Sequence, residues 1–365
     1  MKNPVRWLLP AMAVLLLLGS PFLHVQLTAG GIETLPPDLE SRQAIEILED
    51  EFPAFTASVI PLVIVFEEDQ DIFSKALSLE ISDMCASIRE TEGVISMEHP
   101  FCNPSLFDSE FDEWPQEAVV AWSATVSQEI AMLDVATSYR SGTDEAEALI
   151  GDLRVHTETS EQEVLVGGWS SFEVDMKEHL SDRIPIVLAF VLILTMALVW
   201  LQVRSIVVPI KAVLMNILSV SASFGLIVVV FQDGLLSEAL NFSPQPLDLM
   251  VPPLVFGIAF GLSMDYEVLM LSRIHEAWNE TGDNTLAVAT GLQASGSLIT
   301  GAAAIMIAVF SGFIFADVMI IKSIGFALAV AVFVDATIVR AIVVPSAMRL
   351  MGKANWWSPT IRKKI

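Results

Sequence analysis

Long apolar stretches alternate with one extended polar region along this chain. Six of the stretches approach or reach the length of about 20 residues that a helix needs to cross a bilayer. They are Trp7 to Val25, Ile184 to Val203, Ile206 to Phe231, Met250 to Leu271, Ala294 to Phe315 and Ile324 to Met348. The pattern predicts a polytopic α-helical membrane protein, with one transmembrane helix before the polar region and five after it (1+5).

The polar region, from about Gly30 to Asp182, has the short periodicities of a mixed α and β domain. Apolar residues recur every three to four positions from Phe73 to Ile88, and Asp144 to Arg154 opens with acidic residues, which favour a helix start. The predicted strands are Val59 to Phe66, Val94 to Met97, Ile130 to Thr137 and Glu163 to Gly167. The resulting order, βαββαβ, predicts the α+β split βαβ, or ferredoxin-like, arrangement.

Composition supports the membrane setting and shows that charge is segregated. Hydrophobic residues make up 53% of the chain, charged residues only 17%, and the mean hydropathy is +0.61. Of the 44 acidic residues, 34 lie between Glu33 and Asp182. This acidity argues against nucleic-acid binding. It fits a solvated surface, an adaptation to high salt, or a vestibule for cationic substrates.

The basic residues that flank the apolar stretches predict the orientation. They are Lys2, Arg6, Arg204, Lys211, Arg273, Arg349, Lys353, Arg362, Lys363 and Lys364. All fall on one side of the predicted membrane, which the positive-inside rule assigns to the cytoplasm. We therefore expect a first transmembrane helix in residues 1–28, an extracytoplasmic domain in 29–182, a five-helix bundle in 183–350 and a basic cytoplasmic tail in 351–365. The first stretch also fits a cleaved signal peptide.

The remaining polar chemistry excludes several classes of protein. Cys85 and Cys102 lie in the outer domain, where an oxidising compartment permits a disulfide but does not require one. Neither cysteine has the spacing of a metal site, and the five His residues form no ligand cluster. We find no phosphate-binding Gly-rich motif and no nucleophile, base and orienting triad. From the sequence we therefore expect no metal site, no cofactor site and no enzyme activity.

An acid and a phenol, Asp265 and Tyr266, lie side by side inside the fourth apolar stretch. A charged carboxylate at the centre of a bilayer costs about 2.5–3.5 kcal/mol on insertion scales, so such a residue is a functional candidate. Gly257, Gly261 and Asp265 recur every four residues and share one helix face. Small residues let helices pack closely in lipid, so we expect Asp265 to face another helix. The pair suggests a proton relay.

Other polar residues in the apolar stretches are candidates for a relay or for structural support. Three hydroxyl groups are placed to hydrogen-bond the acid across helices: Ser263, Ser297 and Thr300. Asp335 and Arg340 share the last stretch, but five residues correspond to about 140° of rotation, so we expect no direct pairing between them. Arg340 is then expected to reach the cytoplasmic surface or an acid on a neighbouring helix. Glu267 is expected to lie at a solvated end of its helix.

Three motifs together resemble the MMPL branch of the resistance, nodulation and division (RND) superfamily of transporters. The first is the helix from Phe256 to Arg273 that carries Asp265-Tyr266, and the second is the connector Thr281-Gly-Asp-Asn-Thr285. The third comprises Phe333-Val-Asp335-Ala-Thr-Ile-Val-Arg340, Val344-Pro345 and Asn355-Trp-Trp-Ser-Pro359. The resemblance extends over nearly the whole chain.

The resemblance implies a function and a missing partner. Family members usually have two halves, each with one helix, an outer porter domain and five helices, and their Asp-Tyr pairs face one another. This chain resembles one half, most like the C-terminal half. It is therefore expected to pair with a second half, by homodimerisation or with a separately encoded chain. The implied activity is proton-driven export of lipids, drugs or other hydrophobic molecules from the cytoplasmic membrane. The alternative is a non-transporting sensor or accessory subunit with the same helices.

Overall fold

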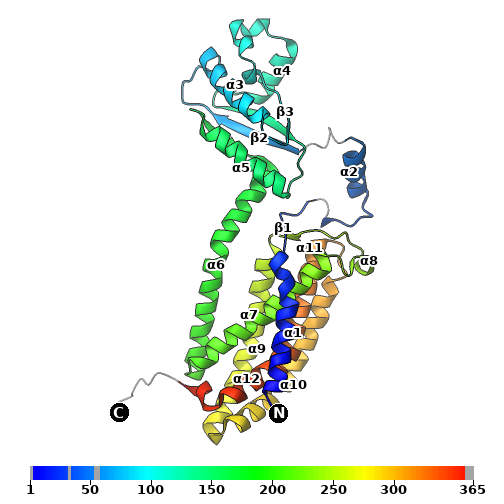
Figure 1. The fold of residues 1–365 in the computed structure, drawn as a ribbon, viewed down its shortest axis with the longest axis vertical. Coiled ribbons are helices and arrows are strands. Elements are labelled where there is room, and N and C mark those ends of the chain that lie inside the picture. Colours follow the sequence, from blue (N-terminus) through cyan, green and yellow to red (C-terminus); the bar gives the residue numbers. More distant parts are fainter. Residues whose placement is uncertain (1–2, 32–33, 53–57, 358–365) are drawn as a thin grey trace, which may run out of the picture. The chain divides into compact units, whose positions relative to one another are not determined.

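The computed structural model describes residues 3–31, 34–52 and 58–357. Several residues used above lie outside these ranges: Lys2, Ser358, Pro359, Arg362, Lys363 and Lys364. The chain divides into two compact units, one formed by Met1–Arg42 with Asp182–Ile365 and the other by Gln43–Ser181 (Figure 1).

The first unit is helical. Within the described residues, six helical segments are long and apolar enough to cross a membrane: Val5–His24, Gly168–Val203, Val207–Gln232, Val251–Thr281, Asn284–Phe313 and Met319–Trp356. Each overlaps one of the predicted apolar stretches. Three of them extend well beyond the apolar residues into polar sequence, because backbone hydrogen bonding continues past the part that lipid requires. These are the segments that begin at Gly168, Val251 and Asn284.

Several of these segments change their helix type along their length. The first contains α1 (Val5–Gly19) and the 3₁₀ turn η1 (Ser20–His24), and the third contains α7 (Val207–Ile227) and the π-helical η6 (Val228–Gln232). The second, fourth and fifth are α6 (Gly168–Val203), α9 (Val251–Thr281) and α10 (Asn284–Phe313). The last comprises α11 (Met319–Val334), the π-helical η7 (Asp335–Val343), α12 (Val344–Met351) and the 3₁₀ turn η8 (Gly352–Trp356). The same unit holds α8 (Ser237–Leu240) and a parallel pair of short strands, β1 (Leu27–Thr28) and β6 (Leu247–Asp248).

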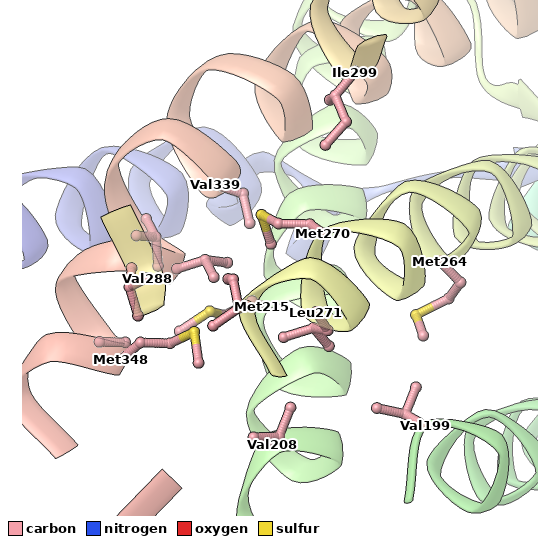
Figure 2. Close-up of a cluster of buried hydrophobic side chains, with 14 of the residues drawn as sticks. Val199, Val208, Met215, Met264, Met270, Leu271, Val288, Ile299, Val339 and Met348 are labelled. Carbon is pink, nitrogen blue, oxygen red and sulfur yellow. The ribbon is translucent and has the colours of Figure 1, made fainter. Parts of the chain in front are cut away.

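Packing in the helical unit depends on apolar side chains and on close approach at glycines. Helices α1, α7, α9, α10 and α11 form one bundle (Figure 1). Its interior is filled by residues such as Met215, Met264 and Met270, which Figure 2 shows together. A Cβ atom on Gly225 would lie 1.9 Å from the carbonyl oxygen of Leu18. Only glycine allows α1 and α7 to meet this closely.

The second unit is built on a four-stranded antiparallel sheet. Its strands are β2 (Ser58–Val65), β3 (Val94–Met97), β4 (Ile130–Thr137) and β5 (Glu163–Val166), and their order in the sheet is β3-β4-β2-β5. Its helices are α3 (Lys75–Arg89), α4 (Gln116–Thr125) and α5 (Asp144–Glu158), with 3₁₀ turns at Pro100–Cys102, Pro104–Asp108 and Phe111–Glu113. Helix α2 (Glu40–Glu51) precedes the sheet in the chain.

Alternation along the strands explains which sheet face is buried. Ile60, Leu62 and Ile64 of β2 are almost fully buried and belong to the same core as Ile81 of α3 and Leu149 of α5. Successive strand residues point to opposite faces of a sheet. The residues that alternate with Ile60, Leu62 and Ile64 therefore line the face that points away from α3 and α5. That face exposes apolar side chains from all four strands: Val59, Ile95, Ile130, Met132 and Leu165.

Candidate functional site

Asp265 lies on an open face of α9. Asp265 and Gly261 are exposed, and a Cβ atom built on Gly257 or Gly261 would have no neighbour within 4 Å. No other helix in the described part of the chain therefore covers this glycine stripe. The expectation that Asp265 faces another helix is not met within this single chain.

The two hydroxyl residues predicted on α10 do not reach this acid. Ser297 and Thr300 are exposed, and within the described residues neither forms a hydrogen bond with Asp265. Any contact they make with the acid therefore needs a rearrangement or a second chain.

Tyr266 turns away from Asp265 and into the bundle. Its hydroxyl donates to the Sδ of Met306 on α10 over 3.3 Å, and the guanidinium of Arg340 lies 5.0 Å from the centre of its ring. Neighbouring residues on a helix point about 100° apart, which separates the phenol from the carboxylate. Within a single chain the two side chains therefore lie in different surroundings.

The buried acid of the bundle is Asp335. Its carboxylate forms an ion pair with the Nη2 of Arg340 at 2.6 Å and accepts a hydrogen bond of 2.8 Å from the Oγ of Ser263. The Nη2 of Arg340 also donates to the backbone carbonyl of Ser263 over 2.5 Å. All three residues are buried. They link α9 to the last membrane segment through charged hydrogen bonds.

The prediction that Asp335 and Arg340 do not pair was wrong. It assumed α-helical winding, whereas residues Asp335–Val343 form a π-helix. A π-helix closes hydrogen bonds between residues five apart, which brings residues at that spacing together on one face. Such wide turns are frequent at functional sites. Arg340 is buried beside an acid of its own segment and does not reach the cytoplasmic surface.

The prediction that Glu267 is a solvated helix end was also wrong. Glu267 is 5% exposed, and Lys211 of α7 is 6% exposed. Their charges interact, and Glu267 also interacts with the charges of Asp335 and Arg340. Glu267 lies well inside α9, which continues to Thr281, and the packing of α7 against α9 buries its side chain.

Beside the Asp335 and Arg340 pair lies a small cavity of the bundle. Its polar lining comes from three helical segments: Asn216, Ser219, Ser263, Tyr266, Asp335 and Arg340. Its volume is about 10 Å³, which is room for about one water molecule. Asp265 does not line this cavity, so α9 has two polar regions, one exposed and one buried in the bundle.

Sequence reasoning missed Lys211, Asn216 and Ser219, although a signal for them was present. All three lie within the predicted span from Ile206 to Phe231, and ionisable residues in such spans usually face the bundle interior. The positive-inside rule instead assigns Lys211 to the cytoplasmic side.

The Asn355-Trp-Trp motif joins the ends of several helices. The side-chain amide of Asn355 donates to the carbonyl of Met348 over 2.6 Å, and the Nε1 of Trp356 donates to the Oδ1 of Asn284 over 3.0 Å. The ring of Trp356 stacks on that of Trp278 with centroids 5.2 Å apart. The motif thus anchors η8 to α9 and α10.

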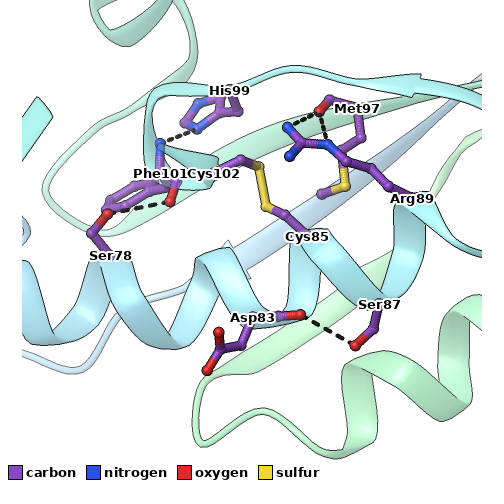
Figure 3. Close-up of a disulfide and its surroundings, with 9 residues drawn as sticks. All are labelled: Ser78, Asp83, Cys85, Ser87, Arg89, Met97, His99, Phe101 and Cys102. Carbon is purple, nitrogen blue, oxygen red and sulfur yellow. Dashed lines mark hydrogen bonds between the residues drawn. A yellow bond between two sulfur atoms is a disulfide. The ribbon is translucent and has the colours of Figure 1, made fainter. Parts of the chain in front are cut away.

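In the second unit, Cys85 of α3 and Cys102 form a disulfide (Figure 3). The bond ties α3 to the 3₁₀ turn Pro100–Cys102. The ring of His99 stacks on Phe101, and its Nε2 lies 2.8 Å from the Oγ1 of Thr125. Burial lowers the pKa of His99 to about 4. These contacts indicate that Cys85, Cys102 and His99 stabilise the fold of the second unit.

Comparison with known proteins shows which protein family this chain resembles. The model of the MMPL family matches residues 33–364. The trehalose monomycolate exporter MmpL3 of Mycolicibacterium smegmatis is 32% identical over 367 residues, which cover 100% of this chain and 34% of that protein. The mycolic acid-containing lipids exporter MmpL11 of the same organism is 32% identical over 366 residues, covering 100% of this chain and 36% of that protein.

A third relative matches more strongly over a shorter range. The heme uptake protein MmpL11 of Mycobacterium tuberculosis is 44% identical over 198 residues, which cover 54% of this chain and 20% of that protein. The chain spans about a third of the length of the relatives that it matches in full. With six membrane-length helices in the part of the chain that the structure describes and a family match over most of its residues, this multi-pass membrane protein belongs to the MMPL family.

Proposed function

We propose that this chain is half of a proton-driven exporter that moves lipids or other hydrophobic molecules out of the cytoplasmic membrane. One observation carries the proposal: the carboxylate of Asp265 lies on an open, glycine-lined face of an apolar helix. Facing lipid, that charge would cost several kcal/mol. A second chain that covers the stripe and presents its own polar groups would remove this cost.

The partner is a second half of the same family, either another copy of this chain or a separately encoded one. Gly257 and Gly261 leave space for a close approach by its helices. The open face of the sheet in the second unit, with its exposed apolar residues, offers further surface to such a partner. Across the interface, Asp265 and Tyr266 would meet an equivalent pair and complete the relay.

The second unit is the proposed extracytoplasmic porter domain, within residues 29–182. Its strand order, β3-β4-β2-β5, and the helices α3 and α5, which follow β2 and β4, support a ferredoxin-like fold. The disulfide between Cys85 and Cys102 supports a position outside the cytoplasm, because disulfides persist in oxidising compartments. Both chain termini are then cytoplasmic, with one membrane helix before the domain and five after it.

The class of substrate follows from the relatives. Two of them are named as exporters of trehalose monomycolate and of mycolic acid-containing lipids. Identity over the whole of this chain supports a lipid substrate, which partitions into the membrane next to the helices. Uptake of a proton by Asp265 would neutralise its charge, change the packing of α9 against the partner, and so shift the porter domain between two arrangements.

Pairing can be tested by cross-linking at the glycine stripe. The chain has two cysteines, and they bond to each other, so Gly261→Cys introduces the single free thiol. We expect a Gly261→Cys dimer under oxidising conditions if the partner is a second copy. Leu17→Cys on α1, which is 71% exposed, is the control for random collision. Equal cross-linking of both variants would contradict a specific interface.

Transport can be tested in proteoliposomes with a fluorescent glycolipid and an imposed proton gradient. Asp265→Asn keeps the shape of the side chain and removes its titration, so it is expected to abolish gradient-dependent export. Glu276→Gln, which changes an exposed acid of α9, is expected to retain it. Export by Asp265→Asn at the normal rate would refute the role of Asp265. A complete lack of gradient-dependent export in the wild-type pair would favour the sensor or accessory alternative.

A further inference from the structure

The segment that joins η6 to α9, residues 233–250, is attached to two distant parts of the chain. It contains α8 and β6, and we call it the η6–α9 loop. One set of contacts ties it to the start of α11, and another ties it to residues 24–42, which lead from the first membrane segment to the second unit (Figure 1). Loops are usually more mobile than the elements they connect. Contacts on both sides of this loop therefore call for an explanation.

Lys322 ties the loop to α11. It is the fourth residue of this helix and is only 5% exposed. Its ammonium group donates to the main-chain oxygens of Leu240, at the end of α8, and of Asn241, and it lies 5.9 Å from the centre of the Phe242 ring. Burying an ammonium group is costly unless its donors are satisfied. Because the acceptors are main-chain atoms, the contact fixes the path of the loop itself.

A second contact with α11 lies about one helical turn from Lys322. The side-chain amide of Gln245 donates to the Sδ of Met319 over 2.8 Å, and Met319 is 5% exposed. Between these two contacts the loop turns at Asn241, whose φ of 49° lies in the left-handed region that Asn tolerates better than most residues. Two side-chain contacts therefore hold the loop at the first turn of α11.

On its other side, the loop pairs with the chain that follows the first membrane segment. The amides of Leu247 and Leu249 donate to the carbonyls of Gln26 and Thr28, each over 2.9 Å, and form the parallel ladder of β6 with β1. A two-stranded ladder is marginally stable by itself. The pairing of β1 with β6 therefore depends on what else holds the loop in place.

Arg42 adds a contact at the boundary of the second unit. Its side chain is 5% exposed, and it donates from Nη2 to the Oγ of Ser243 over 3.0 Å and from Nη1 to the carbonyl of Leu35 over 2.5 Å. A guanidinium group holds its donors in one rigid plane. Arg42 lies in the first turn of α2 and is the last residue of the helical unit before Gln43. The loop is therefore connected to the point where the chain enters the second unit.

Helix α11 continues without interruption into η7, which carries the Asp335 and Arg340 pair. Lys322 precedes Asp335 by 13 residues, which is about 20 Å along a helix at 1.5 Å per residue. Rigid elements of this kind can carry a displacement from one site to another. A movement of this segment at the buried pair would therefore also displace Lys322.

We propose that the η6–α9 loop couples α11 to the entry of the second unit, with Lys322 and Arg42 as the positioning residues on its two sides. When α11 moves, Lys322 carries the loop with it, and the loop then moves Arg42 and the first turn of α2. This coupling reaches the N-terminal end of the second unit and is separate from α6, which follows the second unit in the chain. Its role in transport rests on the proposed function, whereas the coupling itself does not.

The first test is hydrogen exchange of the full-length chain in lipid nanodiscs. Lys322→Met keeps most of the length of the side chain and removes the ammonium group. We expect the amides of Leu247 and Leu249 to exchange at least tenfold faster in this variant, since the ladder with β1 loses the support of α11. Lys353→Met, which changes an exposed lysine of the same membrane segment, should leave both rates unchanged. Unchanged rates in Lys322→Met would overturn the proposal.

The second test separates coupling from two independent attachments. The amides of Ala44 and Ile45 in α2 report on the hold that Arg42 has on this helix. Ser243→Ala removes the hydroxyl group that Arg42 binds and should speed their exchange at least threefold. If the loop couples its two sides, Lys322→Met should speed their exchange as well, and the two changes together should add little to either one. Fully multiplicative effects, or no effect of Lys322→Met on α2, would refute the coupling.

Two further variants control for misfolding and for unspecific effects. Gln245→Leu removes the donor to Met319 and leaves the buried lysine in place, so it releases the same side of the loop more mildly and should also speed these exchange rates. Glu238→Gln changes an exposed acid of the loop and should alter none of them. If Lys322→Met does not fold and Gln245→Leu exchanges as the wild type does, the proposal is overturned.

The third test connects the loop to transport in the proteoliposome assay. Lys322→Met should lower gradient-dependent export at least tenfold. Adding Gln245→Cys and Met319→Cys and bridging the two thiols with a short bifunctional reagent reattaches the loop to α11 without the ammonium group. We expect bridging to restore at least half of the wild-type export and either cysteine alone to restore none.

The outcomes of the transport test distinguish this proposal from the proposed function. Bridged protein that remains inactive, beside a wild type that exports, would refute the role of Lys322 in coupling. A wild type without gradient-dependent export would contradict the proposed function, and the exchange rates at β6 and α2 would still decide whether the loop couples its two sides.

Discussion

Asp265 and Glu267 lie on opposite faces of α9: Asp265 is exposed, while Glu267 is 5% exposed. The helix therefore presents one acid to whatever lies outside the chain and keeps another inside. The two faces of α9 therefore place their acids in different surroundings.

Thiol labelling should distinguish the two faces. With both native cysteines in a disulfide, Asp265→Cys and Met264→Cys each provide one free thiol. In monomeric detergent fractions we expect Asp265→Cys to react with a maleimide at least tenfold faster than Met264→Cys, because Met264 is 8% exposed. Comparable rates, measured by mass spectrometry, would contradict this orientation of α9.

Removing one member of the Asp335 and Arg340 pair should destabilise the helical unit strongly. Arg340→Met leaves the buried carboxylate without its cation, which typically costs about 3–5 kcal/mol. Adding Asp335→Asn should recover much of this loss, because it removes the uncompensated charge. Thermal unfolding in detergent measures both effects. An Arg340→Met variant as stable as the wild type would show that the pair contributes little.

Glycines should differ sharply in their tolerance of alanine. Gly225→Ala places a methyl group 1.9 Å from the carbonyl oxygen of Leu18, so α1 and α7 must separate, at a cost of about 1–3 kcal/mol. Gly257→Ala enters open space and should not lower the stability of the single chain. The comparison requires unfolding of monomeric protein, and an equal loss in both variants would argue against the close contact at Gly225.

Loss of the disulfide should destabilise the second unit alone. Cys85 and Cys102 are 17 residues apart, and closing a loop of this length contributes roughly 3 kcal/mol in the chain-entropy model. A double change to Ser should lower the unfolding temperature of this unit while the helical unit unfolds as before. Calorimetry can resolve the two transitions. A wild-type transition for the double variant would contradict the expectation.

Acid should weaken the second unit through His99. Burial lowers the pKa of His99 from 6.5 to about 4, so the unfolded chain binds a proton there at a higher pH than the folded one does. The stabilisation is complete above pH 6.5 and is lost as the pH falls toward 4, by up to about 3 kcal/mol. His99→Asn should reduce this dependence, whereas His179→Gln, at an exposed site, should not. Denaturant titrations across this pH range supply the measurement.

Local patterns along the chain predicted most of its elements. Apolar length alone located the six membrane-length helices of the described residues, because a span in lipid must be apolar and internally hydrogen-bonded. The predicted strands Val59 to Phe66 and Ile130 to Thr137 match β2 and β4, and three-to-four spacing located α3. Helix ends were less well predicted, as α9 shows by continuing to Thr281, since hydropathy falls before the hydrogen bonding stops.

The sequence by itself determined which ionisable residues lie in apolar stretches and are therefore candidates for function, because a charge in the membrane is costly wherever it points. It singled out Asp265, Tyr266, Asp335 and Arg340 without any coordinates. Only the tertiary structure decided their partners. The π-helical turn joined Asp335 to Arg340, and packing of α7 against α9 buried Glu267. Such contacts depend on helix winding and on neighbours distant in the chain, and neither is encoded in local spacing.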